Sequence, residues 1–213
     1  AEQYLRLALV KLRPVIGEGV DSDWTADGDR LRASLGLDGP LVLYVGRREP
    51  GKNTPLLLRH WRQYVSERQT DATLLLVGPG DAGPLPPQTR DLGFVPRQTK
   101  YDALAAADCF VLPSVNESFS IAIMESWLAG TPVLVNGDCA VTKEHCLRSN
   151  GGLYFDNYVE FAGALDRLLA DRPLAQQLGR QGRRYVLANY RWETIVERYC
   201  ELLAVVAGDE ATL

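Results

Sequence analysis

The sequence has few of the side chains that commonly bind metal ions or form disulfides. It contains two histidines and four cysteines in 213 residues. Cys109, Cys139, Cys146 and Cys200 have neither the paired spacing of a zinc site nor the density of a disulfide-rich domain. We therefore expect reduced thiols in a cytoplasmic protein, with no bound metal and no cofactor. Neither end of the chain has the pattern of a signal peptide.

Long apolar runs and an excess of positive charge are also absent. No apolar run approaches the length that crosses a bilayer, and the formal net charge of -4 argues against nucleic acid as a partner. A local basic cluster such as Arg180, Arg183 and Arg184 leaves room for a peripheral membrane contact, but most such clusters are solvated helix faces. The balance of 46% hydrophobic and 23% charged residues is that of an ordinary globular domain with one core.

Apolar runs of strand length alternate with segments of helix length. Strands are expected at residues 41–45, 73–77, 109–112, 132–135 and 152–155, with a weaker one at 92–95. Helices are expected at residues 54–69, 98–107, 119–129 and 140–148, and near 158–171, 174–189 and 192–207. This order predicts an α/β fold, a doubly wound, mostly parallel sheet of about six strands with helices on both faces. Ligands of such sheets bind beyond the carboxyl ends of the strands.

Two glutamates with seven residues between them follow the third clear strand. Glu125 falls in a segment that is otherwise almost entirely apolar, so its carboxylate needs a cation or a hydrogen-bonding ligand. Glu117 lies in the loop at the mouth of this helix. The N–H groups of Phe119, Ser120 and Ile121 form the expected first turn, where unpaired amides attract an anion. An ordinary crossover whose glutamates only form salt bridges explains the same pattern.

The loop after the first strand carries two cations. Gly46 permits a sharp turn, and Arg47 and Lys52 lie five residues apart on the loop, within reach of one anion. The pair alone is a weak signal, because the Walker spacing is absent and Arg/Lys pairs often decorate turns. The two histidines, His60 and His145, are expected to be structural, since no metal-ligand spacing or Ser-His-Asp arrangement is visible.

The segment ESFSIAIME from Glu117 to Glu125, followed by AGTPV, resembles the E-x7-E motif of retaining glycosyltransferases of family 4, which have the two-domain GT-B fold. The resemblance implies that Glu117 contacts the donor sugar and that Glu125 binds the ribose. It also implies that the amides of Phe119, Ser120 and Ile121 hold the diphosphate. One departure is Ser120, where the family commonly has glycine.

Other segments extend the resemblance over roughly residues 15–205. Gly46, Arg47 and Lys52 match the family's clamp on the donor diphosphate, and Gly93-Phe-Val95 matches a segment whose main chain meets the base. Residues 15–21 resemble the hinge between the two domains. We therefore expect residues 1–21 to be a linker remnant from a missing N-terminal acceptor domain and residues 22–213 to be the nucleotide-sugar binding domain.

The reaction that the resemblance implies is transfer of a hexosyl unit from a nucleotide diphosphate sugar to an acceptor hydroxyl, without a metal and with retention of configuration. The acceptor, a glycan, a lipid or a small molecule, would be bound by the missing domain, so the fragment alone should be inactive. Two alternatives stay open at this point. They are another GT-B enzyme such as a nucleotide-sugar epimerase, and a non-catalytic nucleotide-sugar binding module.

Overall fold

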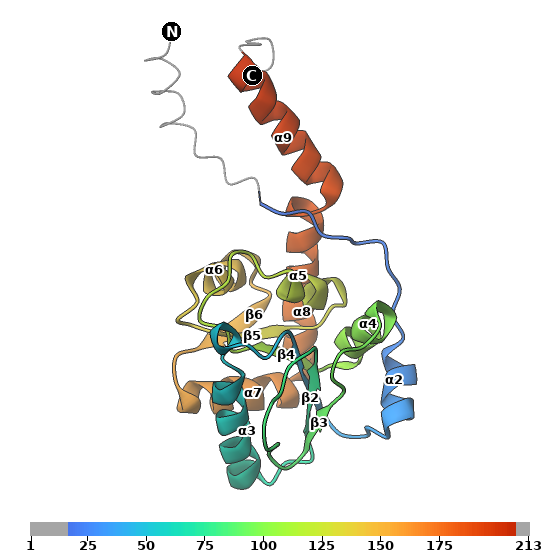
Figure 1. Cartoon of the computed structure of the whole chain (residues 1–213), viewed down its shortest axis with the longest axis vertical. Helices are drawn as coiled ribbons and strands as arrows, with labels where there is room; N and C mark the ends of the chain where they lie inside the picture. The colour runs from blue at the N-terminus through green and yellow to red at the C-terminus, as the bar shows by residue number, and fades with distance from the viewer. Residues whose placement is uncertain (1–16, 208–213) are drawn as a thin grey trace.

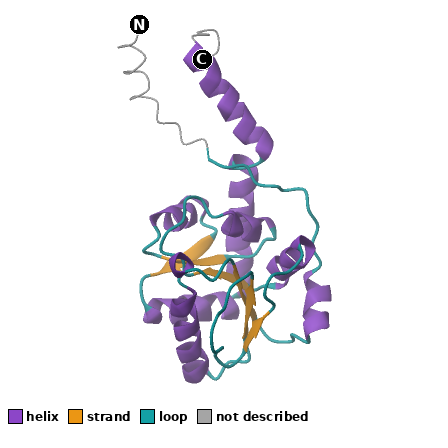
Figure 2. Ribbon diagram, in the orientation of Figure 1, coloured by secondary structure: helices purple, strands orange, loops and turns teal. Residues whose placement is uncertain are grey.

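The computed structural model describes residues 17–207 and contains a six-stranded sheet in which every neighbouring pair of strands is parallel. The strand order is β3-β2-β1-β4-β5-β6. The strands are β1 (Leu41–Val45), β2 (Thr73–Val77), β3 (Thr89–Asp91), β4 (Cys109–Leu112), β5 (Val133–Asn136) and β6 (Gly152–Phe155). The predicted doubly wound α/β fold is thereby confirmed (Figure 2).

Helices cover both faces of the sheet (Figure 1). One face is covered by α3 and α7, and the other by α4, α5 and α6, with α8 packed on α5 and α6. The helices are α2 (Gly28–Leu35), α3 (Thr54–Arg68), α4 (Arg97–Ala106), α5 (Ile121–Leu128), α6 (Ala140–Ser149), α7 (Tyr158–Ala170), α8 (Arg172–Asn189) and α9 (Trp192–Ala207). A short 3-10 helix, η1 (Pro50–Lys52), precedes α3.

The core lies in the central strands because these strands are covered on both sides. All residues of β4 and β5 are buried, as are all but one residue of β1 and of β2. Leu43 pairs in register with Leu75 on one side and with Phe110 on the other, and all three side chains are fully buried. Strands buried on both faces are continuously apolar, which is why the sequence predicted them well.

Three elements differ most from the predictions, whereas the other predicted helices and strands are shifted by at most two residues at either end. The edge strand β3 is Thr89–Asp91 and not residues 92–95, because an edge strand with exposed polar side chains has no apolar signature. Helix α5 begins at Ile121 and not at 119, because the backbone of Ser120 is left-handed with φ 72°. Helix α2 was not predicted, although Asp27 caps its start and a left-handed Gly36 ends it.

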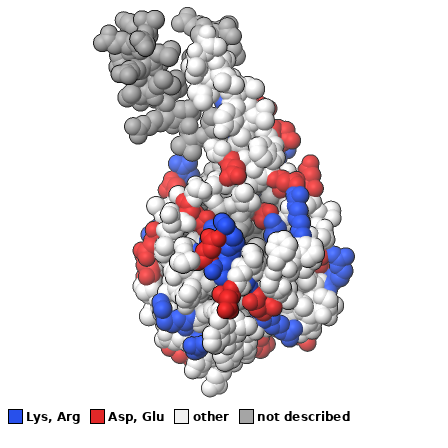
Figure 3. Space-filling view, viewed as in Figure 1, with Lys and Arg blue, Asp and Glu red and all other residues white. Residues whose placement is uncertain are grey.

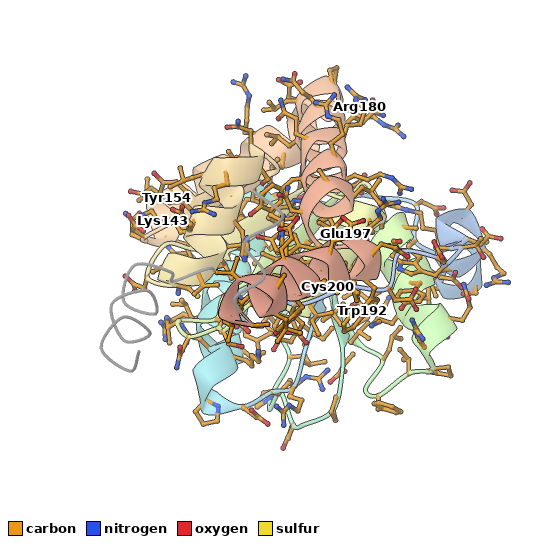
Figure 4. All side chains as sticks on the ribbon, turned by 90° about the horizontal axis from the view of Figure 1, so that it is seen from above. Lys143, Tyr154, Arg180, Trp192, Glu197 and Cys200 are labelled. Carbon is orange, nitrogen blue, oxygen red and sulfur yellow. The ribbon has the colours of Figure 1, made fainter. Side chains whose placement is uncertain are left out.

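The first and last described segments lie together. The N–H of Val20 donates to Tyr190 O over 2.8 Å, and Val20 forms a parallel bridge with Arg191 at the start of α9. From there α9 projects away from the sheet (Figure 1), with Trp192, Glu197 and Cys200 along it (Figure 4). The helix-compatible residues 4–12 lie outside the described residues, and the predicted boundary between residues 21 and 22 stays a prediction. Within residues 17–207 no helix is long and apolar enough to span a bilayer.

Candidate functional site

The strand order reverses between β1 and β4, and the loops that follow these two strands meet at the carboxyl edge of the sheet. Lys52, at the end of η1, and Glu117, in the loop after β4, form an ion pair here. The Lys52 Nζ atom lies 2.8 Å from Glu117 Oε1 and 3.0 Å from Oε2. Their side chains are only 27% and 8% exposed, respectively. The fold therefore brings together two predicted site residues that are far apart in the sequence.

A cavity of about 310 Å³ opens beside this ion pair. Six predicted site residues line it: Gly46, Arg47, Lys52, Glu117, Ser120 and Ile121. Three others, Val95, Phe119 and Glu125, do not line it. Glu18, which the sequence did not single out, contributes a second carboxylate to the wall.

A buried tyrosine of β1 is hydrogen-bonded to the loop between β1 and α3. The Tyr44 hydroxyl donates to Arg47 O over 2.8 Å and accepts from Thr54 Oγ1 over 3.4 Å. Burial raises the pKa of Tyr44, so this hydroxyl stays protonated and can donate. The Arg47 side chain itself is exposed and contacts Glu49 Oε1 at 2.9 Å. Its main chain is thus fixed while its guanidinium remains accessible.

Arg48 is a structural residue, and nothing in the sequence separates it from its neighbour Arg47. Its side chain is 1% exposed. It donates to Gly80 O over 3.0 Å, and also to Gly78 O and to Asp91 Oδ1. Because Asp91 Oδ1 also accepts from Gly93 N–H over 2.8 Å, one guanidinium ties together the loops that follow β1, β2 and β3.

The loops after β1 and β2 are in direct backbone contact at Gly78. Its φ of 127° is rarely adopted by other residues, and a Cβ atom built there would lie 2.2 Å from Gly46 O. The Gly78 N–H donates to Gly93 O over 2.7 Å, which places the segment that contains Val95 beside this contact. Glycine at position 78 is therefore required by a close approach of two loops and not merely by a turn.

Ser120 has the backbone conformation that glycine adopts most easily. Its φ is 72°, and its carbonyl accepts from Ile123 N–H over 3.2 Å as α5 begins. Serine at this position is therefore unfavourable chiefly because of its backbone conformation and less because of its side-chain volume, since the left-handed region is strained for residues with a Cβ. The first turn of α5, with Ile121 and Ala122, faces the cavity. Amides at this position lack partners within the helix.

Phe119 anchors the site loop instead of lining the cavity. Its ring packs edge-on against His145 and Tyr190, at centroid distances of 5.5 and 5.0 Å. The Tyr185 hydroxyl lies 3.0 Å from His145 Nδ1 and 2.9 Å from the Tyr190 hydroxyl. Burial, with a smaller contribution from Arg148, lowers the pKa of His145 to about 4, so the imidazole is neutral near pH 7. The rings around His145 are those of Phe119, Tyr185 and Tyr190, and none of these residues lines the cavity. This position fits the structural role that the sequence predicts for His145.

The other histidine is also part of the packing. His60 is 8% exposed and lies among the rings of Phe155, Tyr158 and Phe161. Burial lowers its pKa. Among the described residues no group of three or more His, Cys, Asp or Glu side chains is arranged to hold a metal ion. Metal independence stays a prediction.

The second glutamate has the cationic partner that its sequence context demanded. Glu125 is 8% exposed, and its Oε1 lies 2.6 Å from Lys100 Nζ on α4. Lys100 also lies over the ring of Tyr101, 4.9 Å from the centroid. The sequence predicted a partner for Glu125 but not which residue, because α4 meets α5 only in the folded chain.

Charges of both signs are interspersed at this edge of the sheet. Figure 3 shows basic and acidic side chains side by side near the middle of one face. Arg47, Lys52 and Lys100 each contact one carboxylate, those of Glu49, Glu117 and Glu125 respectively. Of these side chains, Arg47, Lys52 and Glu117 line the cavity together with the start of α5, and this lining suits a polar ligand with anionic and hydroxyl groups.

A family model described as glycosyl transferases group 1 matches residues 39–171, more than half of the chain and all of the site except Glu18. The chain belongs to this family. Among curated relatives, the D-inositol 3-phosphate glycosyltransferase of Rhodococcus erythropolis is 31% identical over 84% of this chain and 45% of its own length. The enzyme of the same name from Salinispora arenicola is 31% identical over 88% and 48%. The chain thus spans about half the length of the curated relatives it matches.

Solved structures share the fold. Sucrose-phosphate synthase from Thermosynechococcus elongatus superposes with a TM-score of 0.77 and 26% identity, covering 98% of this chain and 57% of the other. HepE of Anabaena, in complex with UDP-glucose, gives a TM-score of 0.74 at 21% identity, covering 88% and 56%. The family and these GT-B neighbours support a glycosyltransferase and do not favour the epimerase or the non-catalytic module.

Proposed function

We propose that this chain binds the nucleotide diphosphate sugar of a retaining glycosyltransferase at the carboxyl edge of its sheet. The observation that carries the proposal is the convergence of Arg47, Lys52, Glu117 and the first turn of α5 on one cavity. Cations and unpaired helix amides suit a diphosphate, and carboxylates suit sugar hydroxyls. Support for this ligand class comes from HepE, a protein of the same fold whose complex contains UDP-glucose.

Each predicted residue has a place in this proposal. Arg47 and Lys52 stabilise the departing diphosphate, together with the amides at the start of α5, and Glu117 orients the sugar. Glu125 holds the ribose from the side of α5 that faces Lys100. The main chain near Val95 meets the base, since this segment is hydrogen-bonded to the loop after β2.

In the proposed reaction, the bond between the sugar C1 and the phosphate oxygen breaks. A bond from C1 to the acceptor oxygen forms on the same face of the hexose, and the acceptor proton passes to the leaving phosphate. No nucleophile and base of the protein are needed for this step. Fixed cations and amides lower the barrier by stabilising charge that develops on the diphosphate.

The acceptor belongs to a further domain in this proposal. The chain supplies one wall of a cleft, and positioning the acceptor against the donor provides much of the acceleration. We therefore expect the 213-residue chain to bind the donor and to transfer no sugar unless a domain that binds the acceptor is present. A cytoplasmic location is part of the proposal, because the described cysteines are all free and nucleotide sugars are made inside cells.

The test is a calorimetric titration of the chain with UDP-, GDP- and ADP-glucose in buffer that contains EDTA. Binding of at least one of these donors, with a stoichiometry of about one and without metal, is the expected result. Binding of none of them, or binding that appears only after Mg²⁺ or Mn²⁺ is added, would contradict the proposal.

A further inference from the structure

The lysine of the candidate site is already occupied by a carboxylate of the same chain. Both oxygens of Glu117 face Lys52 Nζ, at 2.8 and 3.0 Å. Two of the three ammonium protons are therefore directed at Glu117, and one is left for another acceptor. A phosphate that approaches Lys52 meets a cation whose charge Glu117 has largely neutralised.

The two cations that line the cavity differ in how tightly their carboxylates hold them. Arg47 and Glu49 are 68% and 48% exposed, so water screens this pair and it is easily exchanged. Lys52 and Glu117 are 27% and 8% exposed, so their attraction is much less screened. The pair that an incoming diphosphate must disturb is thus Lys52–Glu117 and not Arg47–Glu49.

The cavity wall does not compensate for this neutralisation. Its charged side chains are Arg47, Lys52, Glu18 and Glu117, two of each sign. A nucleoside diphosphate brings one more negative charge than its glucose ester, because its terminal phosphate is free. That charge lies where the sugar is attached in the donor, which is where the proposed function places Glu117.

We propose that Glu117 makes the site discriminate against the bare nucleoside diphosphate, the product of transfer, in favour of the intact sugar donor, by competing with phosphate for Lys52. This inference rests on the proposed function. A sugar gives Glu117 hydroxyl partners that replace Lys52, so the lysine is released to the diphosphate. A bare diphosphate offers Glu117 no such partner and adds a like charge beside it, so product leaves more readily than donor.

The experiment compares the dissociation constants of UDP, GDP and ADP with those of their glucose esters, by calorimetry in EDTA. E117Q removes the charge and keeps the shape of the side chain. We expect it to tighten binding of the preferred nucleoside diphosphate by roughly three- to tenfold, the scale of a partly buried charge pair. The same substitution should leave the glucose ester unchanged or weaken it, so the preference for the donor falls.

Two further variants decide whether Lys52 is the reason. In a K52Q background, the gain from E117Q should shrink to less than about twofold, since no ammonium is left to release. E144Q removes a carboxylate of an exposed surface pair with Arg148 and is the matched control. It should bind both ligands like the unchanged chain.

The outcomes separate the inference from the function on which it rests. An unchanged or weaker affinity of E117Q for the nucleoside diphosphate would overturn the inference while donor binding stands. A gain that persists fully with K52Q, or that E144Q reproduces, would overturn it as well, because net charge alone would then explain the effect. If the unchanged chain bound none of the six ligands, the proposed function would fail and the inference with it.

Discussion

Two ion pairs, one at each edge of the same sheet, show how a structural charge pair differs from one that is suited to a ligand. At the amino edge, Arg32 of α2 donates to Asp108 at 2.7 Å, to Ala106 O at 2.8 Å and to Gly39 O at 2.9 Å. Asp108 also accepts from Leu41 N–H over 2.8 Å. All three guanidinium nitrogens of Arg32 and the Oδ2 atom of Asp108 thus hold β1, α2 and α4 together.

The pair at the carboxyl edge is much less saturated. Within residues 17–207, the side chains of Lys52 and Glu117 form hydrogen bonds only with each other, and both line a cavity. A charged group with unused donors beside open space gains from a ligand, whereas a saturated one does not. The comparison supports the proposal that the carboxyl-edge pair serves binding, and it assigns the amino-edge pair to stability.

The largest effect should come from removing the cation at the carboxyl edge. Lys52→Gln should weaken binding of the nucleotide sugar by about 1.5–3 kcal/mol, the contribution of a charged hydrogen bond. Isothermal titration calorimetry measures this change. Lys143→Gln is the matched control, because Lys143 lies over the ring of Tyr154 (Figure 4) and does not line the cavity. Equal affinities of the two variants would show that Lys52 does not bind the diphosphate.

Breaking the amino-edge pair should have the opposite pattern. Asp108→Ala leaves the Leu41 N–H and the Arg32 guanidinium without their carboxylate, so the free energy of unfolding should fall by about 1–3 kcal/mol. Nucleotide affinity should not change. Urea denaturation and calorimetry on the same sample measure both quantities. A variant that keeps its stability but loses nucleotide binding would reverse the assignment of the two edges.

His145, which packs against Phe119 behind the carboxyl edge, should make the stability of the chain sensitive to acid. The pKa of His145 is about 4 in the folded chain, against an ordinary value of about 6.5. Between these values the unfolded chain binds a proton that the folded chain does not, so stability falls as pH is lowered from 6.5 to 4. We expect His145 to account for about 1–2 kcal/mol of this loss.

The measurement is urea denaturation of the unchanged chain and of His145→Gln at pH 7, 6, 5 and 4. The variant should lose less stability over this range than the unchanged chain. If the free energies of unfolding of the two proteins fell in parallel with pH, the aromatic cluster around Phe119 would not keep His145 from being protonated.

The smallest expected effect concerns the turn that precedes α5. Ser120→Gly relieves a left-handed backbone at φ 72°, so the free energy of unfolding should rise by about 0.5–1 kcal/mol. Thermal denaturation measures this change, and Gly163→Ala, inside α7 where a Cβ meets no atom, gives the size of an ordinary backbone effect for comparison, since alanine should raise stability there by about 0.5–1 kcal/mol. A loss of stability with Ser120→Gly would mean that the serine side chain stabilises the turn.

The sequence predicted the strands whose side chains form apolar runs. The strands β1, β2 and β4 are largely buried and have the predicted bounds, and the buried β5 is shifted by one residue, because apolar runs in parallel sheets mark the strands directly. The edge strand β6 also has the predicted bounds, although three of its four residues are not buried. The sequence places β3 wrongly because an edge strand can carry polar side chains, so that no apolar run marks it. The start of α5 was misplaced because a left-handed serine has no signature in composition.

The placement of three candidate residues in the fold was predictable from their positions along the chain. Arg47, Lys52 and Glu117 lie in loops that follow parallel strands, and such loops gather at one edge of the sheet. Arg48 was not predictable, since nothing in two adjacent arginines tells which one is buried against Asp91. Lys100 was missed because its contact with Glu125 depends on how α4 packs against α5.

The most direct test of this binding mode is a crystal structure of the chain with the nucleotide sugar that it binds best. We expect phosphate oxygens within hydrogen-bonding distance of Lys52 Nζ and of the first amides of α5, with the Lys52–Glu117 contact lengthened or lost. A nucleotide bound elsewhere, for instance beside Arg32 at the amino edge, with Lys52 and Glu117 still paired at 2.8 Å, would contradict it.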